Sequence, residues 1–418
     1  MKHSIEWLDD AENAVPEERA TVGDLRLWLN GQNVTTHISG SDLDDHVTVA
    51  LFGLVNGLVH DWWTIFGSRD REFSLRRYRT GYLLPDVRFY FDGAAFEVSA
   101  HECAYVDPDL RFLSGTQEVL SRADGEAWLG GLITETLARL KDRGLPTSSA
   151  AIRWERVQSS RRSRERHFCE AAGSLGLDPY NIADKLAGFI ESAESVFDDE
   201  PLIEFVCDAA NVDQTRLIGW VDRMMRIKGH QYRLSDLRPI VDQLARNAQP
   251  HANGQAWAMG YRRARAMRRA LNLRPSQAFA SFNELAEKLG SKNFTLAPKV
   301  DGINALRREG PHGINVHIRN HGERDFAPSM HLFALARAVG DAACFTSEEA
   351  APINSLQNAY RQAAGRAFAA EFLAPIDEIQ SMRADDKDQY TIASTFSVAP
   401  QVVYHQLENE KRIAQACT

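Results

Sequence analysis

Residues 330–345 constrain the fold of this chain more than any other stretch, because they read as one long buried helix. Their apolar side chains recur every three or four positions, which places them along one broad helical stripe. The stripe consists of Leu332, Leu335, Ala336, Val339, Ala342 and Ala343. We therefore expect a core helix here, with neighbouring elements packed around it.

A second stretch, residues 366–375, reads RAFAAEFLAP and forms a recognisable pair with the first. The pair shares a frame made of Phe333, Leu335, Ala336, Gly340, Phe368, Ala369, Ala370, Glu371, Leu373 and Pro375. This frame resembles the catalytic core of the ImmA/IrrE family of zinc metallopeptidases. The resemblance covers residues 257–413 and implies a zincin-like carboxy-terminal domain.

The chain departs from the family at the positions that carry the chemistry. In the family the first helix reads FTLAHELGH, where two histidines bind zinc and the glutamate activates the metal-bound water. The second stretch there supplies a glutamate as third ligand. Here Arg337 and Asp341 replace the histidines, Ala338 replaces the general base and Ala364 replaces the third ligand. The resemblance therefore implies a degenerate HExxH motif, a pseudoenzyme without a metal or other cofactor.

The substituted positions admit two interpretations. Arg337 and Asp341 are four residues apart on a helix, so they can form an ion pair that fills the space of the lost metal. Alternatively, together with Arg366 they line a relic pocket that binds a peptide, an anion or the acidic side chain of a partner. The first interpretation is favoured, since a buried pair must satisfy itself before it binds anything else.

A metal site built from other ligands is a further alternative. Four histidines lie near the relic motif, namely His312, His317, His321 and His331. Only alternate residues of a strand share a face, and none of these histidines is spaced as a ligand pair on a predicted helix. Surface histidines are therefore the favoured interpretation.

Composition limits the function further. The 418 residues carry a net charge of -9, with 44% hydrophobic and 25% charged residues, which is typical of an ordinary soluble protein of several domains. The acidic balance argues against a general nucleic-acid or acidic-membrane binder. Five scattered cysteines without a C-x-x-C motif favour reduced thiols. Without a secretory signal or a long apolar run, we expect a cytoplasmic protein with no membrane contact.

We predict an α+β, predominantly helical, multi-domain chain. The expected parts are a mobile arm (1–20), an α+β domain (21–147), a helical middle domain (148–250), a linker rich in Pro, Asn and Gly (247–254), and the pseudo-peptidase domain (254–413) with a helix-turn-helix-like tail.

Local patterns predict the elements of the first part. Residues 24–29 alternate before Asn30-Gly31, and residues 87–99 alternate around Asp92-Gly93, so both predict hairpins, the second with a type I′ turn. Residues 46–66 and 127–142 have helical spacing. The middle part reads as helices only, over residues 164–172, 178–195, 200–210, 213–227 and 235–246. The last part reads as helices at 257–271 and 276–289, then strands at 302–308 and 312–319.

Three further features can be read as sites or as packing. One basic cluster comprises Arg161, Arg162, Arg164 and Arg166, and a second places Arg262, Arg265 and Arg269 on one helix face. A strip that contacts phosphates is one interpretation, and solvated faces paired with carboxylates are the favoured one. For Trp62 and Trp63, core packing is likewise favoured over stacking on a base or ligand. For the helix-turn-helix-like tail, core packing is favoured over base readout.

The resemblance implies a function as well as a fold. Peptidases of the family cleave transcriptional repressors or similar regulators in stress, mobile-element and phage-response circuits. We therefore expect a catalytically inactive regulator or scaffold that binds an unidentified protein partner. Two alternatives stay open: a nucleic-acid-associated regulator that uses the helix from Arg262 to Arg269, and a metallopeptidase with a non-standard metal site.

Overall fold

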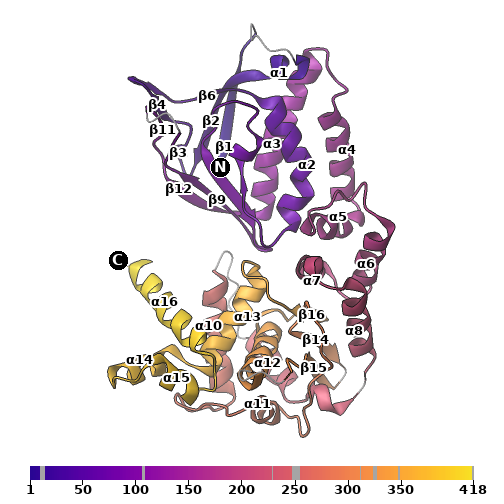
Figure 1. Ribbon diagram of the computed structural model, residues 1–418, viewed down its shortest axis with the longest axis vertical. Helices are drawn as coiled ribbons and strands as arrows, with labels where there is room; N and C mark the ends of the chain where they lie inside the picture. Colours follow the sequence, from indigo (N-terminus) through magenta and orange to yellow (C-terminus); the bar gives the residue numbers. More distant parts are fainter. Residues whose placement is uncertain are drawn as a thin grey trace. The chain divides into compact units, whose positions relative to one another are not determined.

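The computed structural model describes residues 1–9, 15–105, 109–227, 229–246, 255–310, 312–322, 327–346 and 349–416. The chain divides into two compact units, Met1–Ala187 and Gly188–Thr418, where the sequence predicted three domains. The boundary falls inside the expected middle domain. The expected linker 247–254 lies outside the described residues. The prediction of an α+β, predominantly helical fold is confirmed (Figure 1).

Three antiparallel sheets make up the β part of the first unit. The first contains β1 (Lys2–Trp7), β2 (Val22–Leu29), β3 (Gln32–Asn33) and β6 (Val47–Ala50). The second contains β10 (Cys103–Ala104), β11 (Leu110–Phe112), β4 (His37–Ser39) and β5 (Asp42–Asp44). The third contains β12 (Thr116–Ser121), β9 (Ala95–His101), β8 (Asp86–Phe91) and β7 (Phe73–Ser74).

All helices of the first unit except the first, which has no buried residue, contribute side chains to one apolar core. The helices of this unit are α1 (Pro16–Ala20), α2 (Leu51–Gly67), α3 (Arg122–Asp142), α4 (Ser149–Arg161) and α5 (Glu165–Ser174). The hydroxyls of Ser121 and Ser148 accept hydrogen bonds from backbone N–H groups at the starts of α3 and α4, which fixes where these helices begin. Trp62 and Trp63 at the end of α2 are each 1% exposed. The packing interpretation of this pair is therefore confirmed.

The structure corrects three predictions for the first unit. Residues 2–7 are not a mobile arm, because β1 pairs with β2 from Lys2↔Trp28 to Trp7↔Gly23. The start of the helix predicted at 46–66 is β6, which pairs with β2 before α2 begins. In the hairpin of β8 and β9, the N–H of Asp92 donates to the carbonyl of Ala95, so Gly93 and Ala94 form the turn. Only Gly93 has positive φ there, which excludes type I′.

The second unit combines an antiparallel sheet with many helices. Its sheet has the order β13 (Arg233–Leu234), β15 (Gly313–Ile318), β14 (Ala305–Gly310) and β16 (Ala350–Ile353). Its helices are α6 (Asp184–Glu194, which begins in the first unit), α7 (Asp199–Asp208), α8 (Gln214–Arg226), α9 (Leu237–Arg246), α10 (Ala256–Ala270), α11 (Phe282–Lys288), α12 (Ala327–Cys344), α13 (Tyr360–Leu373), α14 (Ile376–Ala384), α15 (Gln389–Thr395) and α16 (Pro400–Ala416).

Two predictions for the middle of the chain are wrong. The helix expected to begin at Asp178 begins at Asp184, because Asp178 instead accepts a hydrogen bond from the N–H of Tyr180 in a local turn. The region expected to be helical throughout also contains β13. This two-residue strand pairs with β15, at Arg233↔Asn315 and Leu234↔Ile314.

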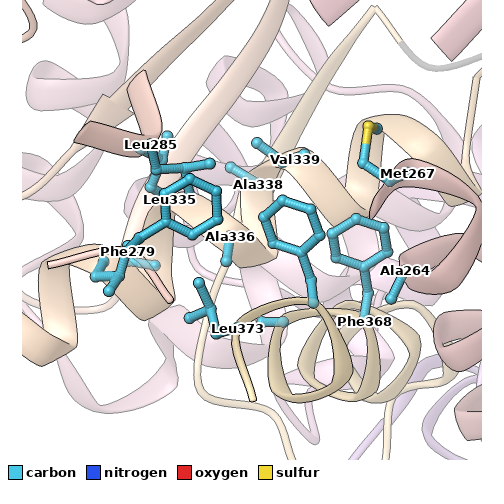
Figure 2. Packing of buried hydrophobic residues seen from close by; sticks show 14 of the residues in the cluster. Ala264, Met267, Phe279, Leu285, Leu335, Ala336, Ala338, Val339, Phe368 and Leu373 are labelled. Atoms are coloured by element: carbon cyan, nitrogen blue, oxygen red, sulfur yellow. The ribbon is translucent and has the colours of Figure 1, made fainter. Parts of the chain in front are cut away.

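The core of the second unit lies between α10, α12 and α13 (Figure 2). All six residues of the predicted apolar stripe on α12 are at most 1% exposed, which confirms a core helix. Phe368 and Phe372 from α13 stack in the same core with their ring centroids 5.4 Å apart. The tail packs inward through Phe396, Val398 and Val403, as its pattern predicts.

Two further observations concern the whole described chain. Cys103, Cys169, Cys207 and Cys344 are free thiols. Among the described helices, none combines the length and the apolar character that crossing a bilayer requires.

Candidate functional site

The two stretches with the resemblance lie on helices that pack against each other, α12 and α13. The two helices approach closely at Gly340, where a side chain would not fit, whereas Gly365 leaves room for one. A Cβ added to Gly340 would lie 2.5 Å from the ring of Phe368, and one added to Gly365 would lie 3.7 Å from the carbonyl oxygen of Arg337. This contact brings the position of Arg337 on α12 next to the second stretch on α13.

Asp341 is the centre of a buried ion-pair group. Its carboxylate is 2% exposed and accepts hydrogen bonds from Arg307 Nε at 2.6 Å and from Arg361 Nε at 2.6 Å and Nη2 at 2.8 Å. Desolvation on its own would raise the pKa of Asp341, but the two guanidiniums outweigh it and hold that pKa below its usual range. The carboxylate is therefore ionised and fully engaged.

Arg337 does not form the expected ion pair with Asp341, so this prediction is wrong. Its Nη2 donates instead to the carbonyl of Asn354 at 2.8 Å and to Oε1 of Gln362 at 2.7 Å. Burial, and then the positive charge of Arg366, lower the pKa of Arg337 to about 9. Asp341 takes partners from other elements because they offer it shorter and bidentate contacts that an i, i+4 neighbour does not provide here.

Glu204 on α7 completes this group from another part of the chain. Its Oε2 accepts a hydrogen bond from Nε2 of Gln362 at 2.7 Å, while Oε1 is buried without a hydrogen-bond partner among the described residues. Burial is the main cause that raises the pKa of Glu204, and the neighbouring Glu200 raises it further. We call Glu204, Arg307, Arg337, Asp341, Arg361 and Gln362 the buried polar cluster.

Arg366, the third residue of the expected relic pocket, is held at the edge of this cluster. Its Nη1 donates to the carbonyl of Leu356 at 2.6 Å, and its Nη2 donates to the carbonyl of Gln357. Burial lowers the pKa of Arg366 to about 10. Arg337 and Arg366 therefore both satisfy backbone carbonyls, which favours an internal scaffold over a ligand cradle.

The chemistry open to the matched positions follows from these contacts. Ala338 and Ala364 are fully buried and carry no polar atom. Asp341 is the single matched residue with ligand atoms, and both of its oxygens accept from arginines. Across the described residues, no group of three or more His, Cys, Asp or Glu side chains is placed to hold a metal ion.

The structure corrects the favoured view of the nearby histidines as surface residues. His312 is exposed, but His317, His321 and His331 are buried. The ring of His317 packs on Tyr232 at a centroid distance of 4.4 Å, and Nε2 of His331 accepts from the N–H of His321 at 3.1 Å. Burial, and then Arg308, lower the pKa of His317 to about 3, so this imidazole is neutral.

The arginines of α10 are engaged to different degrees. Arg262, Arg265 and Arg269 are exposed, as the predicted shared face requires. However, Arg265 Nε donates to Oε1 of buried Glu371 at 2.6 Å. Arg268 is buried and donates to four carbonyls, those of Phe372, Arg274, Pro275 and Gln277. Much of this basic helix therefore serves packing, and Arg262 and Arg269 remain as exposed cations.

In the other basic cluster, in the first unit, two of the four arginines are paired with carboxylates, as the favoured interpretation predicts for the cluster. Arg161 donates to Glu126, and Arg166 donates to Glu170 at 2.8 Å. Arg122 joins both carboxylates. Arg162 and Arg164 carry no such contact in the described part of the chain.

Comparison with known proteins adds no relative to this picture. No protein-family model, no curated protein and no solved structure matches the chain.

Sequence reasoning did not predict most of the buried polar cluster. It singled out Arg337 and Asp341, but it did not predict Glu204, Arg307 or Arg361 as their neighbours. Arg307 lies in β14 with an apolar residue before it, and Arg361 lies one turn ahead of the frame on α13. The burial of Arg307, which requires a buried acid, is not visible in the sequence of β14, ALRREG, because most of its residues are not apolar.

Proposed function

We propose that the chain is a catalytically inactive relative of the ImmA/IrrE metallopeptidases that acts as a regulatory or scaffolding protein-binding module. One observation supports the proposal most. The position of the second zinc-binding histidine is taken by Asp341, and its carboxylate is neutralised by two buried guanidiniums, Arg307 and Arg361. An ion pair of this kind stabilises a fixed core arrangement and leaves no open coordination position for a substrate or water.

The same arrangement supports the loss of the hydrolytic machinery. The position of the general base is Ala338, which cannot take a proton, and the position of the third ligand is Ala364. Arg337 adds a positive charge where a cation would have to sit. The proposed role is therefore in partner recognition within a stress, mobile-element or phage-response circuit of the cytoplasm.

The experiment that tests the ancestry restores the ligands. The variant combines Arg337→His, Ala338→Glu, Asp341→His and Ala364→Glu with Arg307→Gln and Arg361→Gln, because both guanidiniums would otherwise lose the carboxylate of Asp341. This sixfold variant should bind about one equivalent of zinc, whereas the wild-type chain should bind less than about a tenth of an equivalent. The matched control keeps Ala364 and should bind zinc far more weakly.

Three experimental outcomes would contradict parts of this proposal. A folded sixfold variant that binds no zinc would contradict the zincin frame. Near one equivalent of zinc on the wild-type chain, purified without a metal-binding tag, would favour the metallopeptidase with a non-standard site. Recovery of the native chain from cells as a lone monomer, with no stoichiometric protein partner, would contradict the scaffolding role.

A further inference from the structure

A hollow of about 670 Å³ opens on the second unit, away from the matched positions on α12 and α13. It lies between the segment that leads into β13, the loop after α11 and the turn from β14 to β15. The residues that line it include His230, Arg233, Ser235, Ser291, Lys292 and His312. Among the described residues that line it, none is Asp or Glu.

The basic side chains of this hollow have no polar partner among the described residues. Arg233, Lys292, His230 and His312 make neither a hydrogen bond nor an ion pair through their side chains in the part of the chain that the structure describes. Surface arginines of this acidic chain commonly do pair, as Arg238 does with Asp242 at 3.0 Å. Arg233 and Lys292 are therefore two cations at one hollow without a carboxylate partner among the described residues.

A second arginine, Arg308, lies beside Arg233 outside the lining of the hollow, and its Nη2 donates to the carbonyl of Ile227. Arg308 and Arg233 lie opposite Asn315 from its two sides, so they share one row and one face of the sheet. Burial, and then the charge of Arg233, lower the pKa of Arg308, and Arg308 Nε is buried without a hydrogen-bond partner among the described residues. Two neighbouring guanidiniums without a carboxylate between them are repulsive until an anion arrives.

The polar groups around the hollow point to the same ligand chemistry. The hydroxyl of Ser291, a residue that lines the hollow, is buried and has no hydrogen-bond partner among the described residues. The nearby carboxylates are already engaged: Asp236 accepts from Ser235 Oγ at 3.0 Å, and Glu309 accepts from Arg307 at 2.9 Å and from Arg238. The amides of Gln231 and Asn293 add neutral donors and acceptors to the lining.

We propose that this hollow binds a phosphorylated small molecule of the size of a sugar phosphate or mononucleotide. Arg233 and Lys292 hold the phosphate, since a guanidinium fork and an ammonium are the groups that bind a phosphate dianion. The amides and Ser235 contact the hydroxyl groups of the ligand. A volume of about 670 Å³ lies within the range of small-molecule sites. The proposal is independent of the proposed loss of peptidase activity.

The test uses the full chain and calorimetric titration with ribose 5-phosphate, inorganic pyrophosphate and ribose. The two phosphorylated probes should bind with one-to-one stoichiometry, and ribose should not bind. Arg233→Gln and Lys292→Gln should each weaken binding by about tenfold, since a charge-assisted hydrogen bond is lost. The control is the double variant Arg216→Gln/Lys288→Gln, which removes two exposed positive charges that do not line the hollow.

Both variants of the hollow should fold normally, because the side chains of Arg233 and Lys292 make no hydrogen bond or ion pair with the described residues, and an unchanged unfolding midpoint checks this. Absence of binding by both phosphorylated probes would overturn the proposal, as would equal weakening in the control. Binding of a single-stranded oligonucleotide through Arg233 and Lys292, with no binding of the small probes, would also overturn it in favour of a nucleic-acid site.

Discussion

Arg361 holds Asp341 with two parallel hydrogen bonds, from Nε to Oδ1 at 2.6 Å and from Nη2 to Oδ2 at 2.8 Å. The pair joins α13 to α12 in the interior, where both side chains are at most 3% exposed. Arg307 adds a third contact from β14. One carboxylate thus ties together two helices and the sheet, at a position that the proposed relationship assigns to a metal ligand.

Removal of that carboxylate should destabilise the second unit strongly. Asp341→Asn keeps the shape but removes the buried negative charge that Arg307 and Arg361 share, so we expect a loss of about 3–5 kcal/mol in the free energy of unfolding. The measurement is a urea titration, followed through hydrogen exchange of peptides from α12 and α13.

The matched control for this loss is Asp242→Asn, which breaks the exposed ion pair with Arg238 in the same unit. Its effect should be small, because exposed ion pairs contribute little. A further variant, Arg307→Met/Asp341→Leu/Arg361→Met, should recover much of the stability, since it removes the buried charges together. Equal losses for Asp341→Asn and Asp242→Asn would contradict the role of this pair.

Substitution by alanine should have opposite effects on stability at Gly340, in the contact of α12 and α13, and at a glycine with open space around it. A Cβ at Gly340 would lie 2.5 Å from the ring of Phe368, whereas a Cβ at Gly219 in α8 meets no atom within 4 Å. Gly340→Ala should therefore destabilise the second unit by about 1–3 kcal/mol through overpacking. Gly219→Ala should stabilise it by about 1 kcal/mol, because alanine favours the helix.

Thermal unfolding of both alanine variants beside the wild type measures this contrast. Gly260→Ala provides an independent check, since its Cβ would lie 2.4 Å from the carbonyl oxygen of Ala364, where α10 crosses α13. A neutral or stabilising Gly340→Ala would mean that α12 and α13 are not packed this closely.

The sequence predicted α12 and its buried stripe because helical spacing is a local property that one stretch carries by itself. It did not predict β1, although residues 2–7 alternate in burial, because polar residues such as Lys2 and Glu6 on the open face hide the apolar alternation of Ile5 and Trp7. Such a short strand gains its stability from β2, which a local pattern does not contain.

The buried polar cluster shows the same limit at the level of side chains. The spacing of Arg337 and Asp341 allowed an ion pair, but Asp341 binds Arg307, 34 residues away, and Arg361, 20 residues away. Partners from other elements prevail because they reach both carboxylate oxygens with good geometry. The spacing of residues along one helix shows which side-chain contacts can form, and the packing of other elements against that helix determines which of them do form.

Glu204 should make the second unit less stable as the pH rises. Its pKa is raised above the ordinary 4.5 mainly by burial, so the folded chain retains a proton that the unfolded chain has lost. Stability from this group is full below pH 4.5 and is lost as the pH rises through the folded pKa. Glu204→Gln should therefore flatten the fall in the urea midpoint above about pH 5.

The matched control for Glu204 is Glu191→Gln, which removes a carboxylate from the exposed surface of α6. Its urea midpoints should follow those of the wild type across the same pH series. If Glu204→Gln retained the full fall with pH, the proton would be taken up elsewhere.

His317 should have the opposite effect to Glu204, because it should make the second unit less stable as the pH falls. Burial and Arg308 lower its pKa from 6.5 to about 3, so between these values the unfolded chain binds a proton that the folded chain does not. Its contribution is fully present above pH 6.5 and is lost as the pH falls towards 3, by up to about 1.4 kcal/mol per pH unit. His317→Phe keeps the ring contact with Tyr232 and should flatten this loss in urea titrations between pH 4 and 7.

The matched control is His405→Phe, which makes the same exchange at an exposed position and should follow the wild-type curve. An unchanged slope in His317→Phe would show that this buried imidazole takes no part in acid unfolding.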